Sequence, residues 1–252
     1  MKAIPDYTLI YKDDDILVLN KRSGLLVAAD RYDQSAKRLD LEAEKEFGTL
    51  FAVHRIDKDT SGLIVYARNA EAHRSLSMQF EERLVHKTYH CLVHGHPLWK
   101  ENTVNLKLLA DADPRHRTLP NQRYGKEAIT DFTLLAVTGP YSWIQAEPKT
   151  GRTHQIRAHL KSIGFSIVCD PLYSGNQKPV CLSDIKRKWN GDEAEERPLL
   201  SRLALHAYKI SFTHPANGQE VSFTAAYHRD MNAVRKQFSK LFKADPLAEE
   251  QV

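Results

Sequence analysis

The 252-residue sequence predicts an α+β fold, with a mixed, mostly antiparallel sheet and flanking helices. Short strand-like apolar runs follow one another without regularly intervening helical patterns, which favours this class over a doubly wound parallel sheet. The hydrophobic share of 42% supplies enough apolar surface for a folded core. We expect a single domain over residues 1–252, with its core at about 9–230 and a C-terminal helix and tail at 231–252.

Strands are predicted where apolar runs end at turn signals, as Ile16 to Leu19 do before Ser23-Gly24. The predicted strands are 15–21, 63–67, 88–94, 129–137, 142–147, 205–212 and 220–225. Helices are predicted where apolar residues recur every fourth position, at 36–47, 70–84, 154–163 and 230–242. In the second helix this stripe is Ala72, Leu76, Phe80 and Leu84, and Asn69 is the expected N-cap.

Composition excludes several classes of protein. The 36 Lys and Arg against 32 Asp and Glu give a formal net charge of +4, which is only mildly basic. A transmembrane helix needs about 18 consecutive apolar residues, and the sequence has no such run. No secretory signal pattern follows Met1-Lys2, so a cytoplasmic location is expected. Three cysteines without C-x-x-C spacing argue against a disulfide framework and a zinc knuckle.

Two segments are basic and contain no acidic residue, a pattern typical of phosphate binding, although a solvated surface fits either segment equally well. The first runs from Lys149 to Lys161 and includes Arg152, His154 and Arg157. The second, residues 115–126, carries Arg115, Arg117, Arg123 and Lys126.

The polar loop 53–62 runs directly into a predicted buried strand and contains Asp57. Loops positioned by strands often carry catalytic groups, and an aspartate there can act as a nucleophile or a general base. A turn closed by backbone hydrogen bonds to Asp57 is the simpler interpretation of this loop taken alone.

The string Asp57-Lys58-Asp59-Thr60 also resembles the D-x-D-x-T pattern of haloacid-dehalogenase-like phosphotransferases, which work with Mg²⁺. In that family the pattern follows an apolar strand, whereas here His54 and Arg55 precede it. A downstream paired-aspartate loop for the metal is also missing from the sequence. This alternative is therefore the weaker one.

Histidines 86, 90, 94 and 96 would share one face of the strand at 88–94, because side chains alternate with a period of two. Without a cysteine or carboxylate on that face, a solvent-exposed histidine face is expected rather than a metal site. Lys87 and Tyr89 fall on the opposite face. Tyr89 is there either a core aromatic or a platform for a planar ligand.

The segment 151–160 is expected to begin a helix capped by Thr153, with Ile156 and Leu160 facing the core. Arg157 then lies beside the buried edge, where a guanidinium needs an acidic partner. Arg157 then either forms a purely structural ion pair or holds Asp57 in place.

The string from His54 to Leu63 resembles the H-R-[LI]-D-x-x-T-S-G-L motif of the RluA-type family of pseudouridine synthases. Four further elements resemble that family in order, at 20–25, 87–89, 151–160 and 205–215. Together the five cover roughly residues 10–230, which makes chance an unlikely explanation. Arg22 departs from the pattern, because the family usually has proline there.

The resemblance implies the pseudouridine synthase fold, with a single catalytic domain and without the S4-type RNA-binding domain that often precedes it. It also implies an enzyme that detaches uracil from ribose, turns it and reattaches it through carbon 5. Asp57 matches the essential aspartate, Arg157 its salt-bridge partner, and Tyr89 the aromatic that stacks on the target base. Arg55 matches the residue that enters the space left by the flipped base.

The expected partner is ribosomal or transfer RNA, contacted by Lys87, Arg152, His154 and the basic residues of 115–126. We expect a monomer with no obligate protein partner, no metal and no cofactor. The sequence does not choose between attack of the carboxylate on carbon 1′ and abstraction of the 2′ proton. The Mg²⁺-dependent phosphotransferase and a noncatalytic RNA-binding module are the alternatives.

Overall fold

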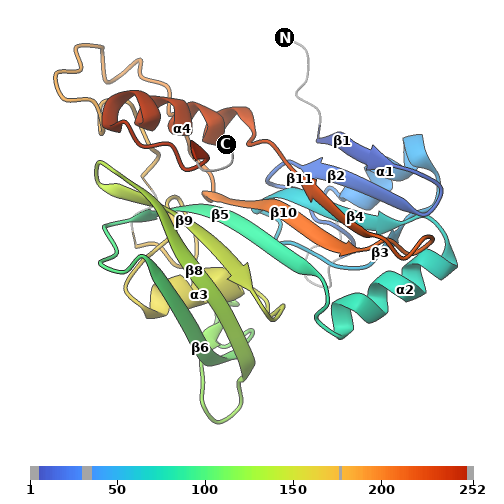
Figure 1. Ribbon diagram of the computed structural model, residues 1–252. Coiled ribbons are helices and arrows are strands. Elements are labelled where there is room, and N and C mark those ends of the chain that lie inside the picture. The colour runs from blue at the N-terminus through green and yellow to red at the C-terminus, as the bar shows by residue number, and fades with distance from the viewer. Residues whose placement is uncertain (1–5, 30–35, 176–177, 249–252) are drawn as a thin grey trace. The chain divides into compact units, whose positions relative to one another are not determined.

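The computed structural model describes residues 6–29, 36–175 and 178–248, so the last four residues of the predicted tail lie outside the described part. The chain forms two compact units (Figure 1). Unit 1 comprises residues 1–89 and 206–226, and unit 2 comprises residues 90–205 and 227–252. The strand β5 (His86–His94) passes from unit 1 into unit 2.

Unit 1 is a mixed sheet with two helices. Its elements are β1 (Tyr7–Lys12), β2 (Ile16–Lys21), α1 (Leu39–Phe47), β3 (Phe51–Ala52), β4 (Ser61–Ala67), α2 (Ala70–Glu81), most of β10 (Leu205–Thr213) and β11 (Glu220–Thr224). The strand order is β1-β2-β4-β10, with β3 on β4 and β11 on β10. Only the β4–β10 pair among these pairings is parallel.

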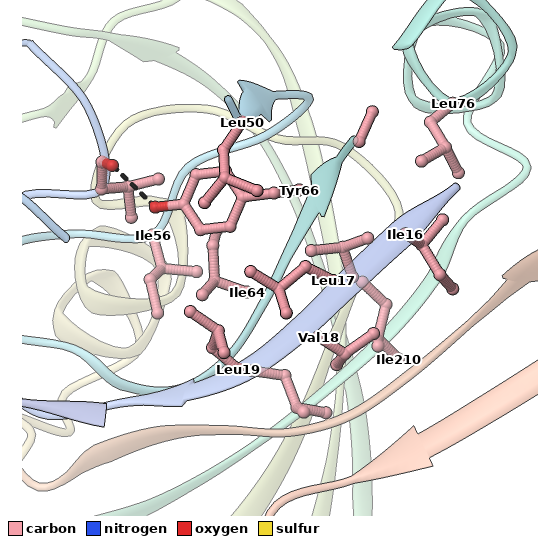
Figure 2. Packing of buried hydrophobic residues seen from close by; sticks show 14 of the residues in the cluster. Ile16, Leu17, Val18, Leu19, Leu50, Ile56, Ile64, Tyr66, Leu76 and Ile210 are labelled. Atoms are coloured by element: carbon pink, nitrogen blue, oxygen red, sulfur yellow. Dashed lines mark hydrogen bonds between the residues drawn. The ribbon is translucent and has the colours of Figure 1, made fainter. Parts of the chain in front are cut away.

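The core of unit 1 surrounds β2 and β4, in which every residue is buried. Figure 2 shows Leu17 and Leu19 of β2 close to Ile64 and Tyr66 of β4. The Tyr66 hydroxyl donates a hydrogen bond of 2.7 Å to the carbonyl oxygen of Val27, which satisfies the polar end of a buried ring. A strand covered on both faces reads as a continuous apolar run, and this explains why both strands were predictable.

One glycine in unit 1 is required by close strand packing. Gly62 has φ +111°, and a Cβ at this position would lie 2.2 Å from the carbonyl oxygen of Ala207. Gly62 is paired with Ala207 in the parallel β4–β10 ladder. Only glycine therefore lets β10 approach the strand that follows the Asp57 loop.

Unit 2 is an antiparallel sheet with two helices. Its elements are the end of β5, β6 (Glu101–Leu109), β7 (Leu119–Pro120), β8 (Lys126–Thr138), β9 (Tyr141–Pro148), α3 (Gln155–Ser162) and α4 (Arg229–Phe242). The strand order is β5-β9-β8-β6-β7. With the parallel pair of unit 1, this confirms the predicted α+β class and its mixed, mostly antiparallel pairing.

Most predicted elements are confirmed within a few residues, and Asn69 caps α2 by accepting the N–H of Ala72 at 2.8 Å. Leu84 was expected on that helix but lies beyond its end and is exposed. The strand β6 was not predicted, because asparagine and lysine interrupt it. The alternation of Val104, Leu106 and Leu108 was the available signal.

The predicted solvent-exposed histidine face is wrong at His90. This residue is 1% exposed, and its Nδ1 lies 2.6 Å from the hydroxyl of Tyr227. Burial lowers the pKa of His90 to about 4, so the imidazole is neutral at physiological pH. Residues 90–93 of β5 are all buried, so both faces of the strand are covered there.

Candidate active site

The loop that carries Asp57 joins β3 to β4 in unit 1, and Asp57 is half-buried. The N–H of Thr60 donates to the carbonyl oxygen of Asp57 at 3.1 Å, which closes a turn immediately before the buried strand. The backbone-bonded turn expected from this loop is therefore present. The turn is closed by the carbonyl oxygen of Asp57, and the loop that carries the Asp57 carboxylate continues directly into β4.

Residues 21–25, at the end of β2 and in the loop after it, brace the Asp57 loop through three hydrogen bonds. The N–H of Gly24 donates to the carbonyl oxygen of Lys58 at 2.8 Å, and the hydroxyl of Ser23 donates to that of Asp59 at 2.7 Å. The ammonium group of Lys21 donates to the same Lys58 oxygen at 3.0 Å. Both residues that follow Asp57 are thus held through their main chains.

Lys21 is fully buried at the end of β2. Its ammonium group also donates to the carbonyl oxygens of Arg22 and Leu25, each at 2.9 Å. Three N–H donors thus meet three carbonyl acceptors, which offsets much of the cost of burying the charge. Lys21 belongs to one of the recognised motifs, but sequence reasoning gave it no role of its own.

A pocket in unit 1 brings Tyr89 and Lys87 together on the same face of β5. Its lining residues are His54, Leu63, Lys87, Tyr89, Ala207, Lys209 and Ile210. Burial and then the negative charge of Asp57 raise the pKa of Tyr89, so the ring carries a neutral phenol. The structure thus places Tyr89 within the electrostatic reach of Asp57.

His54 fixes the beginning of the same loop. Its Nε2 accepts the backbone N–H of Val65 at 3.0 Å, and its ring stacks on Phe80 at 4.6 Å between centroids. Burial, with a smaller effect of the charge of Lys87, lowers the pKa of His54 to about 3. His54 is therefore a neutral acceptor that lines the pocket. His54 belongs to the motif at residues 54–63, but the sequence did not predict that it lines the pocket.

The pocket also contains cationic side chains. Burial lowers the pKa of Lys87 below its ordinary value, as expected for an ammonium group that is partly removed from water. Lys209, an exposed residue of β10, lines the same pocket and was not singled out in the sequence. Positive charge therefore borders the Tyr89 ring from both β5 and β10.

In unit 2, Arg157 has Asp170 as its acidic partner. Its Nε and one terminal nitrogen each donate to a different oxygen of Asp170 at 2.8 Å, and both side chains are buried. Asp170 also accepts the backbone N–H groups of Leu172 and Tyr173. Burial alone would raise the pKa of Asp170, but Arg157 and these N–H groups hold it below its ordinary value. The predicted pairing of Arg157 with Asp57, which belongs to the other unit, stays a prediction.

The predicted helix cap at Thr153 is wrong. Residue His154 precedes α3 in the left-handed conformation with φ 51°, and the side chain of Gln155 satisfies the neighbouring donors instead. The Oε1 of Gln155 accepts the N–H of Arg152 at 2.9 Å and the hydroxyl of Thr150 at 2.7 Å. The Nδ1 of His154 lies 3.2 Å from the hydroxyl of Tyr173, so His154 contacts the ring beneath Arg157.

Acidic side chains from outside the two basic segments lie close to their cations. Arg117 donates from Nε to Asp113 at 2.7 Å, and Lys149 lies 3.0 Å from Asp131. Backbone carbonyl oxygens accept from two further predicted RNA contacts, Arg115 to Pro171 at 2.9 Å and Arg152 to Glu127 at 3.0 Å. The side chains of Arg55, Arg123 and Lys126 are exposed.

Comparison with known protein families matches residues 15–162 to the RNA pseudouridylate synthase family. The chain belongs to this family. The matched range contains Asp57, Tyr89 and Arg157, and the RluA-type resemblance is confirmed by individual pseudouridine synthases. Ribosomal large subunit pseudouridine synthase D of Zymomonas mobilis is 32% identical over 239 residues, which span 90% of this chain and 71% of that protein.

A second pseudouridine synthase, the dual-specificity RNA pseudouridine synthase RluA of Escherichia coli, is 32% identical over 222 residues, 88% of this chain and 93% of that protein. Among solved structures, human RNA pseudouridylate synthase domain containing 1 aligns with a TM-score of 0.69 and 25% identity, covering 90% of this chain and 86% of that one. These likenesses confirm the pseudouridine synthase fold.

Membership in the pseudouridine synthase family makes this protein an isomerase that acts on RNA. This membership argues against both alternatives from the sequence, the Mg²⁺-dependent phosphotransferase and the noncatalytic RNA-binding module. None of the helices in the described ranges has the length and apolar content needed to cross a membrane. Within those same ranges, no group of three or more His, Cys, Asp or Glu side chains could hold a metal ion.

Replacing Lys21 with Met is expected to slow this pseudouridine synthase and to destabilise it by about 2 to 4 kcal/mol, because three carbonyl oxygens, one of them buried, lose their donor. Turnover at saturating RNA should fall more than RNA affinity, since the Asp57 loop loses one brace. Urea unfolding and pseudouridine formation measure the two effects. Lys45→Met, at an exposed residue paired with Glu42, is the matched control and should change neither. Unchanged turnover in Lys21→Met would contradict the bracing role.

Proposed function

We propose that this pseudouridine synthase modifies uridines in structured ribosomal or transfer RNA, with Asp57 as its catalytic carboxylate. The observation that carries the proposal is the shared environment of Asp57 and Tyr89, which are separated in sequence but electrostatically coupled in unit 1. The braced loop supports it further, because a catalytic carboxylate must be held in a fixed position.

The physics of the substrate suits this arrangement. A uridine inside stacked RNA must be extruded before its ribose can be reached, at a cost of a few kcal/mol. Stacking of the uracil on Tyr89 returns about 1 to 3 kcal/mol, and phosphate contacts add to this. Lys87 and Lys209, which line the pocket with Tyr89, are the residues we assign to the phosphates of the flipped nucleotide.

The reaction then proceeds without gain or loss of atoms. The bond between N1 of uracil and C1′ of ribose breaks, assisted by the Asp57 carboxylate either as a nucleophile at C1′ or as a base for the 2′ proton. The detached uracil turns on Tyr89, and a bond forms between C5 and C1′. Loss of the C5 proton and protonation of N1 complete the isomerisation.

Tyr89 contributes its ring and its hydroxyl differently. Because its pKa is raised, the phenol is protonated at neutral pH and can pass a proton only as a relay. Tyr89→Phe should therefore bind RNA within about twofold of wild type and turn over about a hundredfold more slowly. Tyr89→Leu should lose affinity as well, because it lacks an aromatic face. Filter binding and single-turnover kinetics separate these effects, and normal turnover in Tyr89→Phe would remove the hydroxyl from the mechanism.

Other residues are assigned to holding the RNA. We propose that Arg55 enters the space left by the flipped base, and that Arg152, His154, Arg115, Arg123 and Lys126 contact the backbone. Arg117 was predicted to join them, but its pairing with Asp113 makes it the weakest of the group. We further propose a cytoplasmic monomer that needs no protein partner, metal or cofactor.

The test is release of tritium from RNA labelled at C5 of uridine. Ribosomal and transfer RNA transcripts are incubated with the purified protein in the presence of EDTA, and tritium in water is counted. We expect stoichiometric release from a small number of uridines in one or both RNAs. Carbodiimide mapping then identifies the positions. Binding of both RNAs without any release would overturn the proposed substrate class.

A further inference from the structure

The turn at residues 121–125 in unit 2 presents an aromatic side chain to solvent. Tyr124 is 63% exposed, and the guanidinium carbon of Arg123 lies 4.9 Å from the centre of its ring. Other large aromatics of unit 2, such as Trp143 and Phe132, are buried in the core. An exposed tyrosine ring with an arginine guanidinium packed over it offers an aromatic surface and a positive charge at the same point.

The backbone of this turn is fixed by hydrogen bonds. The Oδ1 of Asn121 accepts the N–H groups of Arg123 at 3.0 Å and Tyr124 at 2.9 Å. The N–H of Gly125 donates to the carbonyl oxygen of Asn121 at 3.0 Å, and the N–H of Asn121 donates to that of Lys107 at 2.8 Å. A Cβ on Gly125 would lie 2.3 Å from the Asn121 oxygen, so the close turn requires glycine. Tyr124 is therefore presented by an ordered turn.

The turn lies beside a segment already assigned to RNA contact. It leads into β8, which runs alongside β6 (Figure 1). Arg152 donates to the carbonyl oxygen of Glu127, so the segment before α3 contacts the beginning of β8. Lys126 is exposed at the same place, and Glu127 faces Lys107 across the ladder. The surroundings of Tyr124 are thus polar and rich in cations, which suits RNA better than an apolar protein surface.

We propose that Tyr124, with Arg123 beside it, is a platform on which an unpaired RNA base outside the catalytic pocket stacks. This inference rests on the proposed RNA substrate and adds a specific contact to it. Arg123 and Lys126 contact the adjoining phosphates. The platform makes the enzyme favour RNA in which a single-stranded nucleotide accompanies the target uridine, because paired bases have no free face.

The platform predicts a loss of affinity with a distinctive salt dependence. Tyr124→Ala should raise the Kd for the transcripts used in the tritium assay, and the KM, about tenfold, or 1.4 kcal/mol, with kcat unchanged. The slope of log Kd against log salt should stay the same, since no charge is removed. Arg123→Ala should lower that slope by somewhat less than one. Tyr124→Phe should restore wild-type affinity because it keeps the ring.

Leu98→Ala is the control, because Leu98 is fully exposed in the same unit but is not aromatic. A Kd of Tyr124→Ala within twofold of Leu98→Ala would overturn the platform. So would a Tyr124→Phe variant as weak as Tyr124→Ala, because the hydroxyl rather than the ring would then matter. Failure of the proposed function is distinguishable, since it appears as absence of tritium release by the wild-type enzyme, whereas the platform is read from affinity. Circular dichroism of each variant verifies folding.

Discussion

Asp57→Asn is expected to abolish pseudouridine formation and to leave RNA affinity within about tenfold, or 1.4 kcal/mol. The amide has the shape of the carboxylate but is neutral, so it neither attacks C1′ nor takes the 2′ proton. The hydrogen bonds that hold the loop use the carbonyl oxygens of Asp57, Lys58 and Asp59, which the substitution leaves in place. The defect should therefore be chemical and not conformational.

Asp59→Asn is the matched control for Asp57→Asn, because it removes a carboxylate two residues away on the same braced loop. Ser23 binds the main chain of Asp59, so this variant should fold and turn over nearly as wild type does. Single-turnover tritium release measures both variants. Residual activity of Asp57→Asn above about a hundredth of wild type would contradict the assignment, as would an equal loss in Asp59→Asn.

The parts of the fold that sequence predicted are those encoded locally. The buried strand β2 is a continuous apolar run from Ile16 to Leu19, and β4 is one from Leu63 onwards. Lys87 and Tyr89 share a face because side chains alternate with a period of two. The Asp57 loop was predicted for the same reason, because a contiguous motif joins it to β4. The bracing of this loop by Lys21 was not predicted, because the carbonyl oxygen that Lys21 binds belongs to Lys58, 37 residues away in the sequence.

The features that the sequence did not reveal depend on partners outside the segment concerned or on a competing side chain. The basic windows contained no acid in sequence, yet Asp113 and Asp131 pair with their cations from outside. Thr153 had the right residue type for a cap, but the chain enters α3 through His154 in the left-handed conformation, and the Gln155 side chain accepts the N–H of Arg152 ahead of the helix. Asp170, 13 residues beyond Arg157, lies in a segment without periodicity, so only the need for some acid could be foreseen.

The Arg157–Asp170 pair is expected to dominate the stability of its surroundings. Asp170→Asn keeps an oxygen for the N–H groups of Leu172 and Tyr173, but it removes the negative charge opposite a buried guanidinium. Breaking a buried pair on one side costs about 3 to 5 kcal/mol, so Asp170→Asn and Arg157→Met should each destabilise by this amount. The double variant should lose much less than the sum of the two, because neither charge is then left alone. Urea unfolding of the four proteins measures the coupling, and additive losses would contradict it.

The pH dependence of unfolding checks the same pair independently. The pKa of Asp170 is lowered in the folded protein, so its contribution to stability is fully present above the ordinary aspartate value of about 4 and is lost as pH falls through the folded value. Wild-type unfolding free energy should therefore decline more steeply in this acidic range than that of the double variant. Equal slopes would show that Asp170 is not responsible.

Turnover of the double variant then decides whether Arg157 also serves the reaction. If Arg157 only forms a structural ion pair, Arg157→Met with Asp170→Asn should recover activity together with stability. We expect instead that folding recovers while turnover stays below about a hundredth of wild type, because we propose that the reaction uses the Arg157 guanidinium, which Asp170 holds in a fixed orientation. Arg157→Lys should show the same separation, since lysine keeps the charge but lacks the planar fork that matches two carboxylate oxygens. A double variant with restored turnover would confine Arg157 to the pair with Asp170 and would end its proposed partnership with Asp57.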